Sequence, residues 1–247
     1  MTEQQPFSGR VALVTGASGG IGRAIALGLA GAGASVAVHY GAGARAAREL
    51  AETITARGGA ATPFGADLRD PDAPVQLVDR VAAELGPIAL LVNNAGVGRQ
   101  LTWEQTTLED FDESYAVNLR APFMATRRAL PAMVSAGFGR VLFLSSVAAR
   151  TGGIVGPHYA AAKSGLHGLT HFLAGRLAGS GVTVNALAPA LIADTAMLPG
   201  DPTQLRSRIP VGRLGEPAEV ADLALSVMRN GYLTNQVISI DGGMFPG

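Results

Sequence analysis

The sequence predicts an α/β fold in which one seven-stranded parallel sheet carries helices on both faces, within a single domain over residues 1–247. Three observations lead to this fold class. Short apolar runs alternate with helix-length stretches along the whole chain, an alternation that is typical of parallel sheets. The runs are apolar nearly throughout, such as VALVT at 11–15, as in strands that are buried on both faces. No repeat, low-complexity linker or change of composition divides the chain.

Seven apolar runs are expected to form the strands. They lie at 11–15, 35–39, 61–66, 88–92, 140–145, 182–187 and 236–240. The stretches between them are expected to be helices, and several begin with Pro or Asp. These stretches span 20–31, 43–57, 71–85, 107–135, 157–178 and 217–228. Right-handed crossovers then place helices on both faces of the sheet. A segment rich in Pro, Gly and Arg at 188–216 interrupts the alternation, and we expect a substrate lid within it, at about 190–213.

Composition and charge exclude several classes of function. The chain is 48% hydrophobic and has 19 basic against 19 acidic residues, so disorder is excluded and neither nucleic acid nor an anionic membrane surface is an expected partner. It contains no cysteine, which excludes disulfides, zinc–thiolate sites and thiol nucleophiles. His167 and His171 have a metal-compatible spacing but no acidic third ligand on their helix, so no metal is expected.

The sequence also indicates where the protein works. It begins with polar residues rather than with an apolar signal segment. Residues 24–44 carry no charged side chain, yet their apolar period changes midway from helical to extended. We therefore expect a helix, a turn and a strand in this segment rather than a membrane span, and a cytoplasmic protein.

A glycine-rich turn, TGASGGIG at 15–22, follows the first expected strand and leads into a helix. Glycine allows a tight turn at positive φ and lets backbone N–H groups approach a pyrophosphate, which a helix N-terminus also favours. The spacing departs from G-x-G-x-x-G, and no Gly-Lys-Ser/Thr sequence ends the turn. We therefore expect a dinucleotide rather than ATP in a Rossmann-type site; a plain glycine-rich turn is the alternative. The expected cofactor contacts are Gly16, Ser18, Gly20, Ile21 and Gly22.

The end of the second strand indicates which dinucleotide binds. In NAD-binding proteins a carboxylate about 20 residues past the glycines accepts hydrogen bonds from the adenosine ribose. Residues 36–48 contain no Asp or Glu; Tyr40 stands near the place of that acid, with His39, Arg45 and Arg48 nearby. A missing carboxylate removes repulsion against a 2′-phosphate, and an Arg within reach binds it. NADP(H) is therefore favoured over NAD(H), with Tyr40 and Arg45 as contacts. A solvated helix face is the alternative for both arginines.

Tyr159 and Lys163 are four residues apart on an expected helix and so share one face. A fixed positive charge beside a phenol lowers a pKa that is otherwise near 10, which makes tyrosine a usable acid or base. Lys163 is the only lysine among the 19 basic residues, and arginine cannot exchange its proton in this way. Ser145 and Ser146 end the fifth strand; because neighbours on a strand face opposite ways, we assign only Ser146 to the site. Alone, the Tyr–Lys spacing also occurs in ordinary helices.

Together, these residues resemble the short-chain dehydrogenase/reductase family, in its tyrosine-dependent single-domain form, over nearly the whole chain. The matching positions are TGASGGIG at 15–22, Asp67 in GADL, Asn93-Asn94-Ala95-Gly96, Asn118 in AVNL, Ser146, Tyr159, Lys163, Pro189 and Asp241-Gly242-Gly243. The resemblance implies that Tyr159 exchanges a proton with the substrate oxygen, which Ser146 hydrogen-bonds. It also implies that Lys163 holds the nicotinamide ribose and lowers the tyrosine pKa, and that Asn118 positions water. The implied cofactor contacts are Asp67, Leu68, Asn93, Ala95, Gly96, Tyr159, Lys163, Pro189 and Ile192.

Within the family the chain is most similar to the 3-oxoacyl-(acyl-carrier-protein) reductase and carbonyl reductase group. This similarity implies an NADP(H)-dependent hydride transfer between nicotinamide and a ketone, a 3-oxoacyl thioester or a related carbonyl substrate. An NAD-dependent alcohol or sugar dehydrogenase of the same family is the nearest alternative, and a non-catalytic cofactor-binding regulator a distant one.

The resemblance also bears on partners. The family implies a homotetramer, and the expected helix at 157–178 offers small residues for close packing, namely Ala160, Ala161, Gly165 and Gly168. An acyl carrier protein has weak support, because 131–139 contain no basic residue and 174–182 contain only Arg176. The other candidates for a carrier contact are Arg206, Arg208 and Arg213 in the expected lid.

Three positions depart from the family's pattern. Ala190 replaces the usual glycine after the proline, Asp194 stands where threonine is frequent, and Asn235 stands where glycine is common. The second departure changes a residue that would contact the cofactor, and none of the three touches the catalytic set.

Overall fold

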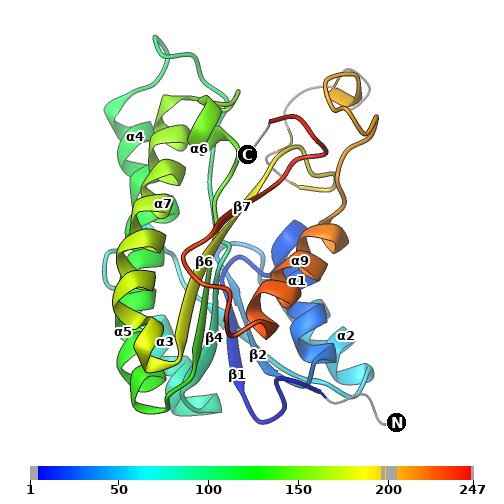
Figure 1. The fold of residues 1–247 in the computed structure, drawn as a ribbon, viewed down its shortest axis with the longest axis vertical. Coiled ribbons are helices and arrows are strands. Elements are labelled where there is room, and N and C mark those ends of the chain that lie inside the picture. Colours follow the sequence, from blue (N-terminus) through cyan, green and yellow to red (C-terminus); the bar gives the residue numbers. More distant parts are fainter. Residues whose placement is uncertain (1–4, 196–197, 199–204, 246–247) are drawn as a thin grey trace.

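The computed structural model describes residues 5–195, 198 and 205–245 (Figure 1). Seven strands form one sheet in the order β3-β2-β1-β4-β5-β6-β7, and every neighbouring pair is parallel. The strands are β1 (Val11–Val14), β2 (Ser35–Tyr40), β3 (Ala60–Gly65), β4 (Ile88–Asn93), β5 (Gly139–Leu144), β6 (Val182–Pro189) and β7 (Val237–Ile240). The predicted fold class is confirmed, and each strand ends within two residues of its predicted bounds.

Two helical layers cover the sheet (Figure 1). One layer consists of α1 (Gly20–Gly31), α2 (Ala44–Ala56) and α9 (Pro217–Arg229). The other consists of α3 (Ala73–Leu85), α5 (Ala121–Ser135) and α7 (Pro157–Leu177). Alternate side chains of β1 serve the two layers: Ala12 and Val14 belong to one buried core, and Val11 and Leu13 to the other. A strand buried on both faces therefore needs apolar residues at every position.

The expected helix at 107–135 is wrong as a single element. The structure divides it into α4 (Leu108–Tyr115), a π-helical turn η1 (Ala116–Arg120) and α5. Thr107 and Asp110 form a capping box at the start of α4. The π turn contains Asn118, whose buried side chain bonds the loop after β4. Apolar periodicity in the sequence cannot reveal this contact between residues far apart in the chain. Two short elements were also not expected, α6 (Ala148–Thr151) and the 3₁₀ turn η2 (Ala178–Ser180).

The order of the strands creates the place for a site. After β3 the chain crosses the sheet and forms β4 on the other side of β1. The connections that follow the neighbouring strands β1 and β4 therefore lead in opposite directions along the sheet. In such sheets ligands bind outside the carboxyl ends of the strands at this point. The helix α6 and the segments around residue 190 and residue 210 gather at one end of the molecule (Figure 1).

The described parts of the expected lid are joined at its base. Ile192 and Gly215 form an isolated parallel bridge. The Gly215 N–H donates to the Leu191 carbonyl at 3.0 Å, and the Ala193 N–H donates to the Gly215 carbonyl at 2.9 Å. Residues 196–197 and 199–204 of the expected lid lie outside the described residues.

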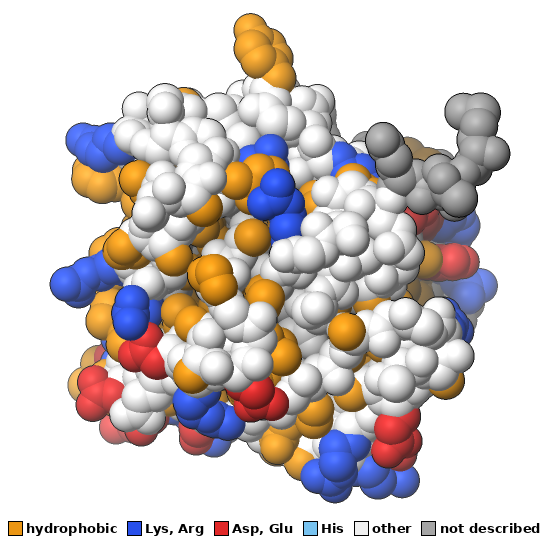
Figure 2. All heavy atoms as spheres, turned by 90° about the horizontal axis from the view of Figure 1, so that it is seen from below, with side chains coloured by type: hydrophobic (Ala, Val, Ile, Leu, Met, Phe, Trp, Pro, Cys, Tyr) orange, Lys and Arg blue, Asp and Glu red, His pale blue; other side chains and the backbone are white. Residues whose placement is uncertain are grey.

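The surface carries both signs of charge. On the face shown in Figure 2, acidic and basic side chains are interspersed around the edge, as equal numbers of 19 basic and 19 acidic residues suggest. Among the helices that the structure describes, none is long and apolar enough to cross a membrane.

Candidate active site

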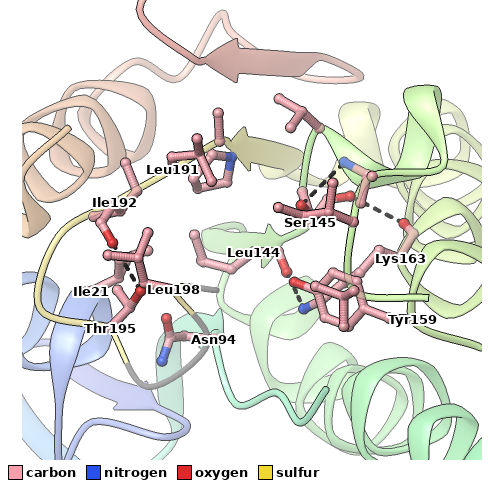
Figure 3. Close-up of a pocket in the computed structure, with 18 residues that line it drawn as sticks. Ile21, Asn94, Leu144, Ser145, Tyr159, Lys163, Leu191, Ile192, Thr195 and Leu198 are labelled. Atoms are coloured by element: carbon pink, nitrogen blue, oxygen red, sulfur yellow. Dashed lines mark hydrogen bonds between the residues drawn. The ribbon is translucent and has the colours of Figure 1, made fainter. Parts of the chain in front are cut away.

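Two adjoining cavities lie at the carboxyl ends of the strands. The tyrosine cavity, of about 140 Å³, contains Tyr159 and Lys163 (Figure 3). The glycine-loop cavity, of about 590 Å³, lies against the turn after β1. Both cavities are lined by Ile21, Asn94 and Thr195, so they adjoin each other at these three residues. This arrangement suits an elongated ligand whose reactive end reaches Tyr159.

Tyr159 and Lys163 lie one turn apart near the start of α7, which Pro157 opens. Tyr159 is 6% exposed and Lys163 is 3% exposed. The Lys163 Nζ donates to the Leu144 carbonyl at 2.7 Å and lies 5.7 Å from the centre of the Tyr159 ring. Both side chains stand on the side of the cavity opposite Ile192 and Leu198 (Figure 3). The predicted pair is therefore brought together at one wall.

Burial controls the protonation of both groups. It raises the pKa of Tyr159 to about 12, and a hydrogen bond with Ser146 acts in the opposite direction. It lowers the pKa of Lys163 to about 8. The expected lowering of the tyrosine pKa is therefore wrong for this structure. The physical reason is that the desolvation of a phenolate outweighs the one hydrogen bond that favours it, while the ammonium is engaged with the Leu144 carbonyl.

Ser145 and Ser146 point in different directions, as expected for neighbours. Ser146 reaches Tyr159, and its Oγ accepts a hydrogen bond from the Ala148 N–H at 3.2 Å. The Ser145 Oγ bonds the Lys163 carbonyl at 3.1 Å and lies 2.8 Å from the His167 Nε2. Ser145 thus fastens the end of β5 to α7. The only sequence signal for this contact is that His167 lies one helical turn after Lys163.

Asn118 is fully buried and uses its side chain to hold a loop. Its amide group donates to the Val97 carbonyl at 2.8 Å and to the Ser114 Oγ at 2.9 Å. Its Oδ1 accepts from the Val97 N–H at 3.0 Å. Both amide hydrogens are therefore occupied, and the implied role of Asn118 in positioning water stays a prediction.

The glycine-rich turn is shaped by close contact with the loop after β4. Gly16 has φ +63°, and a Cβ there would lie 2.9 Å from the Ala95 Cα. A Cβ at Gly22 would overlap the Asn94 Nδ2 and the Gly16 carbonyl. The Asn94 amide donates to the Thr15 and Gly16 carbonyls at 2.9 and 3.1 Å. Asn94 is thus a site residue that the sequence did not single out, although it lies in the quoted Asn-Asn-Ala-Gly motif.

The turn can accept an anion. The helix α1 begins after Gly19, which gives it no side-chain cap, so its first N–H groups are available to a phosphate. No atom of the described residues lies within 4 Å of a Cβ placed at Gly19. A phosphate group therefore has both backbone donors and space at this point, and the residues present fit a dinucleotide.

Most of the predicted cofactor contacts line one of the two cavities. The glycine-loop cavity is lined by Gly16, Ser18, Gly20, Ile21, Asp67, Leu68, Ala95 and Gly96. The tyrosine cavity is lined by Ile21, Tyr159, Lys163, Pro189 and Ile192. Asp194 and Thr195, at the departure from the family's pattern, lie beside Gly20. Gly22 lies inside the turn, where the absence of a Cβ allows the turn to pack against Asn94.

Three predicted contacts lie elsewhere. The Tyr40 ring packs against Gly65, whose Cβ would lie 2.9 Å from the Tyr40 Oη. Arg45 pairs with Glu49 at 3.7 Å, and its side chain is 88% exposed. Asn93 is buried and donates to the Thr126 Oγ1 at 3.0 Å. None of the three lines either cavity. For Tyr40 and Asn93 the reason is strand alternation, which turns the neighbouring residue toward the site instead.

His39 is the neighbour of Tyr40 that faces the site. Its Nδ1 accepts from the Gly16 N–H at 3.0 Å, and its Nε2 donates to the Ala66 carbonyl at 3.1 Å. Burial lowers the pKa of His39 to about 4, so the ring is neutral near pH 7. With both nitrogens engaged, His39 cannot donate to a phosphate; it joins the turn after β1 to the loop after β3.

Comparisons with known proteins agree with this geometry. A sequence model described as short chain dehydrogenase matches residues 10–205. The 3-oxoacyl-[acyl-carrier-protein] reductase of Synechocystis sp. is 38% identical, over 96% of this chain and 98% of its own. The acetoacetyl-CoA reductase of Rhizobium meliloti is also 38% identical, with the same coverage.

A solved structure is similar over the whole fold. A blue fluorescent protein from a metagenomic library, in complex with NADPH, is 35% identical with a TM-score of 0.91, and the match covers 97% of this chain and 99% of that one. The fold and the site thus define an oxidoreductase of the dinucleotide-binding α/β class. The chain belongs to the short-chain dehydrogenase/reductase family, near its 3-oxoacyl reductase members.

Proposed function

We propose that this protein is an NADP(H)-dependent reductase of ketones and 3-oxoacyl thioesters that uses Tyr159 as its general acid. One observation carries the proposal. A buried tyrosine, beside Ser146 and one helical turn from Lys163, lines a cavity that adjoins the glycine-loop cavity. This arrangement brings Tyr159, the proton donor, close to the reactive end of a bound dinucleotide.

The polar residues of the tyrosine cavity have separate roles in the reduction. A bound nicotinamide supplies the hydride that converts the carbonyl carbon to a carbinol carbon. Tyr159 donates its phenolic proton to the carbonyl oxygen, so that the product is a neutral alcohol. The Ser146 hydroxyl donates a hydrogen bond to the same oxygen and orients it. Lys163, held by the Leu144 carbonyl and 5.7 Å from the centre of the Tyr159 ring, supplies a positive charge that offsets part of the cost of burying the phenolate left on Tyr159. Alcohol oxidation runs through the same groups in reverse.

NADP(H) is the cofactor that we favour over NAD(H). No Asp or Glu occurs in residues 36–48, so the end of β2 has no carboxylate to repel a 2′-phosphate. A structural relative is in complex with NADPH. The proposed preference no longer depends on Tyr40 or Arg45, because neither lines the glycine-loop cavity.

The lining of the tyrosine cavity indicates the substrate class. Lys163 is the one charged side chain among the described residues that line it. The remaining surface is largely apolar and includes Val147, Ala148, Ile154, Val155, Leu191 and Leu198. We propose an uncharged ketone with apolar substituents, for which the reacting part of a 3-oxoacyl thioester is one example. An NAD-dependent alcohol or sugar dehydrogenase is the alternative within the family.

Two of the four arginines that are candidates for contact with an acyl carrier protein are engaged within this chain. Arg176 stacks on the Phe172 ring at 3.7 Å and donates to its carbonyl. Arg213 is paired with Glu219 at 2.6 Å. Arginines that are already engaged by their own chain are poor docking groups for an acidic partner. We therefore propose a free ketone or a small thioester as the substrate.

We also propose a homotetramer, in which α7 forms part of an interface. Ala161, Gly168 and Phe172 are exposed along one stripe of α7, and Phe172 is 54% exposed. Gly165 does not belong to this stripe, because a Cβ there would lie 2.6 Å from the Leu119 side chain of the same chain. Light scattering is expected to give four chains per particle and a smaller particle for Phe172→Asp. A monomer in both cases contradicts the interface.

Initial rates of cofactor oxidation test the proposed activity. NADPH and NADH are compared with an acetoacetyl thioester, ethyl acetoacetate, an aryl ketone and a keto sugar. We expect faster turnover with NADPH and with the apolar ketones or the thioester. Faster turnover with NADH and the keto sugar would instead identify a sugar dehydrogenase.

A further inference from the structure

Two histidines lie one turn apart on α7, and each contacts a neighbouring segment. The His167 Nε2 lies 2.8 Å from the Ser145 Oγ. The His171 Nδ1 lies 2.7 Å from the Asn235 Oδ1. Among the described residues, no third side chain completes a metal site with the two rings. Ser145 lines the tyrosine cavity, whereas Asn235 lines neither cavity. His167 therefore has a direct link to the proposed active site, and His171 has none.

The groups proposed for the chemistry come from two different elements. Ser146 lies just after β5, whereas Tyr159 and Lys163 lie on α7. Backbone hydrogen bonds fasten the chain after β5 to β6, since the Ser145 N–H donates to the Leu187 carbonyl at 2.7 Å. Contact with α7 is made by side chains instead. The spacing between Ser146 and the Tyr159–Lys163 pair therefore depends on these side-chain links.

Lys163 is held both at its side chain and at its backbone. Its Nζ donates to the Leu144 carbonyl at 2.7 Å, and its own carbonyl accepts from the Ser145 Oγ at 3.1 Å (Figure 3). Two consecutive residues at the end of β5 thus hold one residue of α7. The backbone link positions the turn of the helix that carries Lys163, and the side-chain link positions its ammonium group.

His167 determines how the Ser145 hydroxyl can point. A serine hydroxyl has one proton, and Ser145 gives it to the Lys163 carbonyl. The Ser145 Oγ must then accept a hydrogen bond from the His167 Nε2–H. This second bond favours one of the three staggered positions of the 5% exposed serine side chain. Without His167, the hydroxyl keeps one partner, and its position is less well defined.

We propose that His167 is a positioning residue for the reduction. By donating to the Ser145 Oγ, it keeps this hydroxyl on the Lys163 carbonyl and so fixes the spacing between Ser146 and the Tyr159–Lys163 pair. The inference rests on the proposed function, because it assigns His167 a role in the reaction that Tyr159 is proposed to carry out. His167 acts through Ser145 and is not itself a proton donor to the substrate.

Steady-state kinetics with NADPH and ethyl acetoacetate test the inference. His167→Leu removes the N–H donor at similar side-chain volume. We expect kcat to fall about tenfold, because small misplacements of reacting groups are costly in the transition state. KM for the ketone is expected to stay within about twofold, since the apolar lining of the tyrosine cavity is unchanged. His167→Gln offers an N–H donor at a similar reach, and we expect it to recover kcat to within about threefold of the unmodified protein.

Two further variants separate positioning from general support of the fold. His171→Leu is the matched control, because it removes the contact with Asn235 one turn further along the same helix. Its kcat is expected to stay within about twofold of the unmodified value. Ser145→Ala removes the group through which His167 acts. Adding His167→Leu to Ser145→Ala is therefore expected to lower kcat by no more than about twofold further. Cofactor fluorescence on NADPH binding verifies that each variant is folded.

Several outcomes would overturn the inference. They are a kcat of His167→Leu within twofold of the unmodified value, an equal loss in His171→Leu, no recovery in His167→Gln, and additive losses in the double variant. Failure of the unmodified protein to reduce any of the ketones or thioesters would instead overturn the proposed function.

Discussion

The two cavities of this protein are built in different ways. The tyrosine cavity depends on the identity of a few buried side chains, since Tyr159 and Lys163 are nearly inaccessible and have shifted pKa values. The glycine-loop cavity depends on the path of the backbone, which Gly16, Gly22 and Asn94 fix through close contacts and hydrogen bonds. Chemistry in the first region is therefore lost with one functional group, whereas binding in the second is lost when the backbone is displaced.

The sharpest test of this contrast removes one hydroxyl from the tyrosine cavity. Tyr159→Phe is expected to lower kcat about 10³-fold, because general acid catalysis is worth 10²- to 10⁴-fold. The dissociation constant of NADPH is expected to stay within about twofold, since the backbone of the glycine-loop cavity is unchanged. Steady-state rates and cofactor fluorescence measure the two quantities. Retention of a tenth of the activity would show that another group supplies the proton.

The second test uses pH to disturb the glycine-loop cavity through His39. The pKa of this ring falls from 6.5 to about 4 on folding, so the unfolded chain binds more protons between these values. The free energy of unfolding is therefore expected to decrease as the pH drops from 6.5 to 4, by about 3 kcal/mol from this group. Urea titrations across this range measure the change.

Two variants isolate the contribution of His39. His39→Gln is expected to give a flatter dependence between pH 6.5 and 4, because glutamine does not titrate. His171→Gln is the control, since His171 is exposed and bonds Asn235 away from both cavities. Parallel curves for the unmodified protein and His39→Gln would contradict the account.

A third test compares two glycines of the same turn. Gly22→Ala places a Cβ against the Asn94 amide and the Gly16 carbonyl, and overpacking of this kind costs about 2 kcal/mol. We expect lower stability and weaker cofactor binding. Gly19→Ala is the matched control, because its Cβ meets no atom of the residues that the structure describes within 4 Å and its φ of −161° suits any residue. Equal effects of the two substitutions would contradict the packing role of Gly22.

The smallest expected effect is a gain in cofactor selectivity. Gly19→Arg places a cation at the open start of α1, and an exposed ion pair with a phosphate is worth about 1 kcal/mol. The ratio of kcat/KM for NADPH over NADH is therefore expected to rise about fivefold, with no change in the rate at saturating cofactor. Ratios measured at low and high salt test whether the gain is electrostatic, since it should shrink as salt is added.

Residue patterns predicted the fold well because the sheet is buried on both sides. Such strands are continuous apolar runs, and all seven were placed within two residues. The prediction of one helix at 107–135 was wrong because helical periodicity in the sequence continues through the π turn η1. Within this turn, Asn118 makes a tertiary hydrogen bond to the loop after β4.

The sequence by itself determined the chemical groups of this protein: a glycine-rich turn, a tyrosine and a lysine four residues apart, and no acid near the end of β2. Those features are local, so spacing and residue type are sufficient to recognise them. Only the tertiary structure decided which side chains face the cavities. It turned His39 inward and Tyr40 outward. Strand alternation places neighbouring side chains on opposite faces, but contacts between loops far apart in the chain decide which of the two faces the cavity, and no local pattern encodes those contacts.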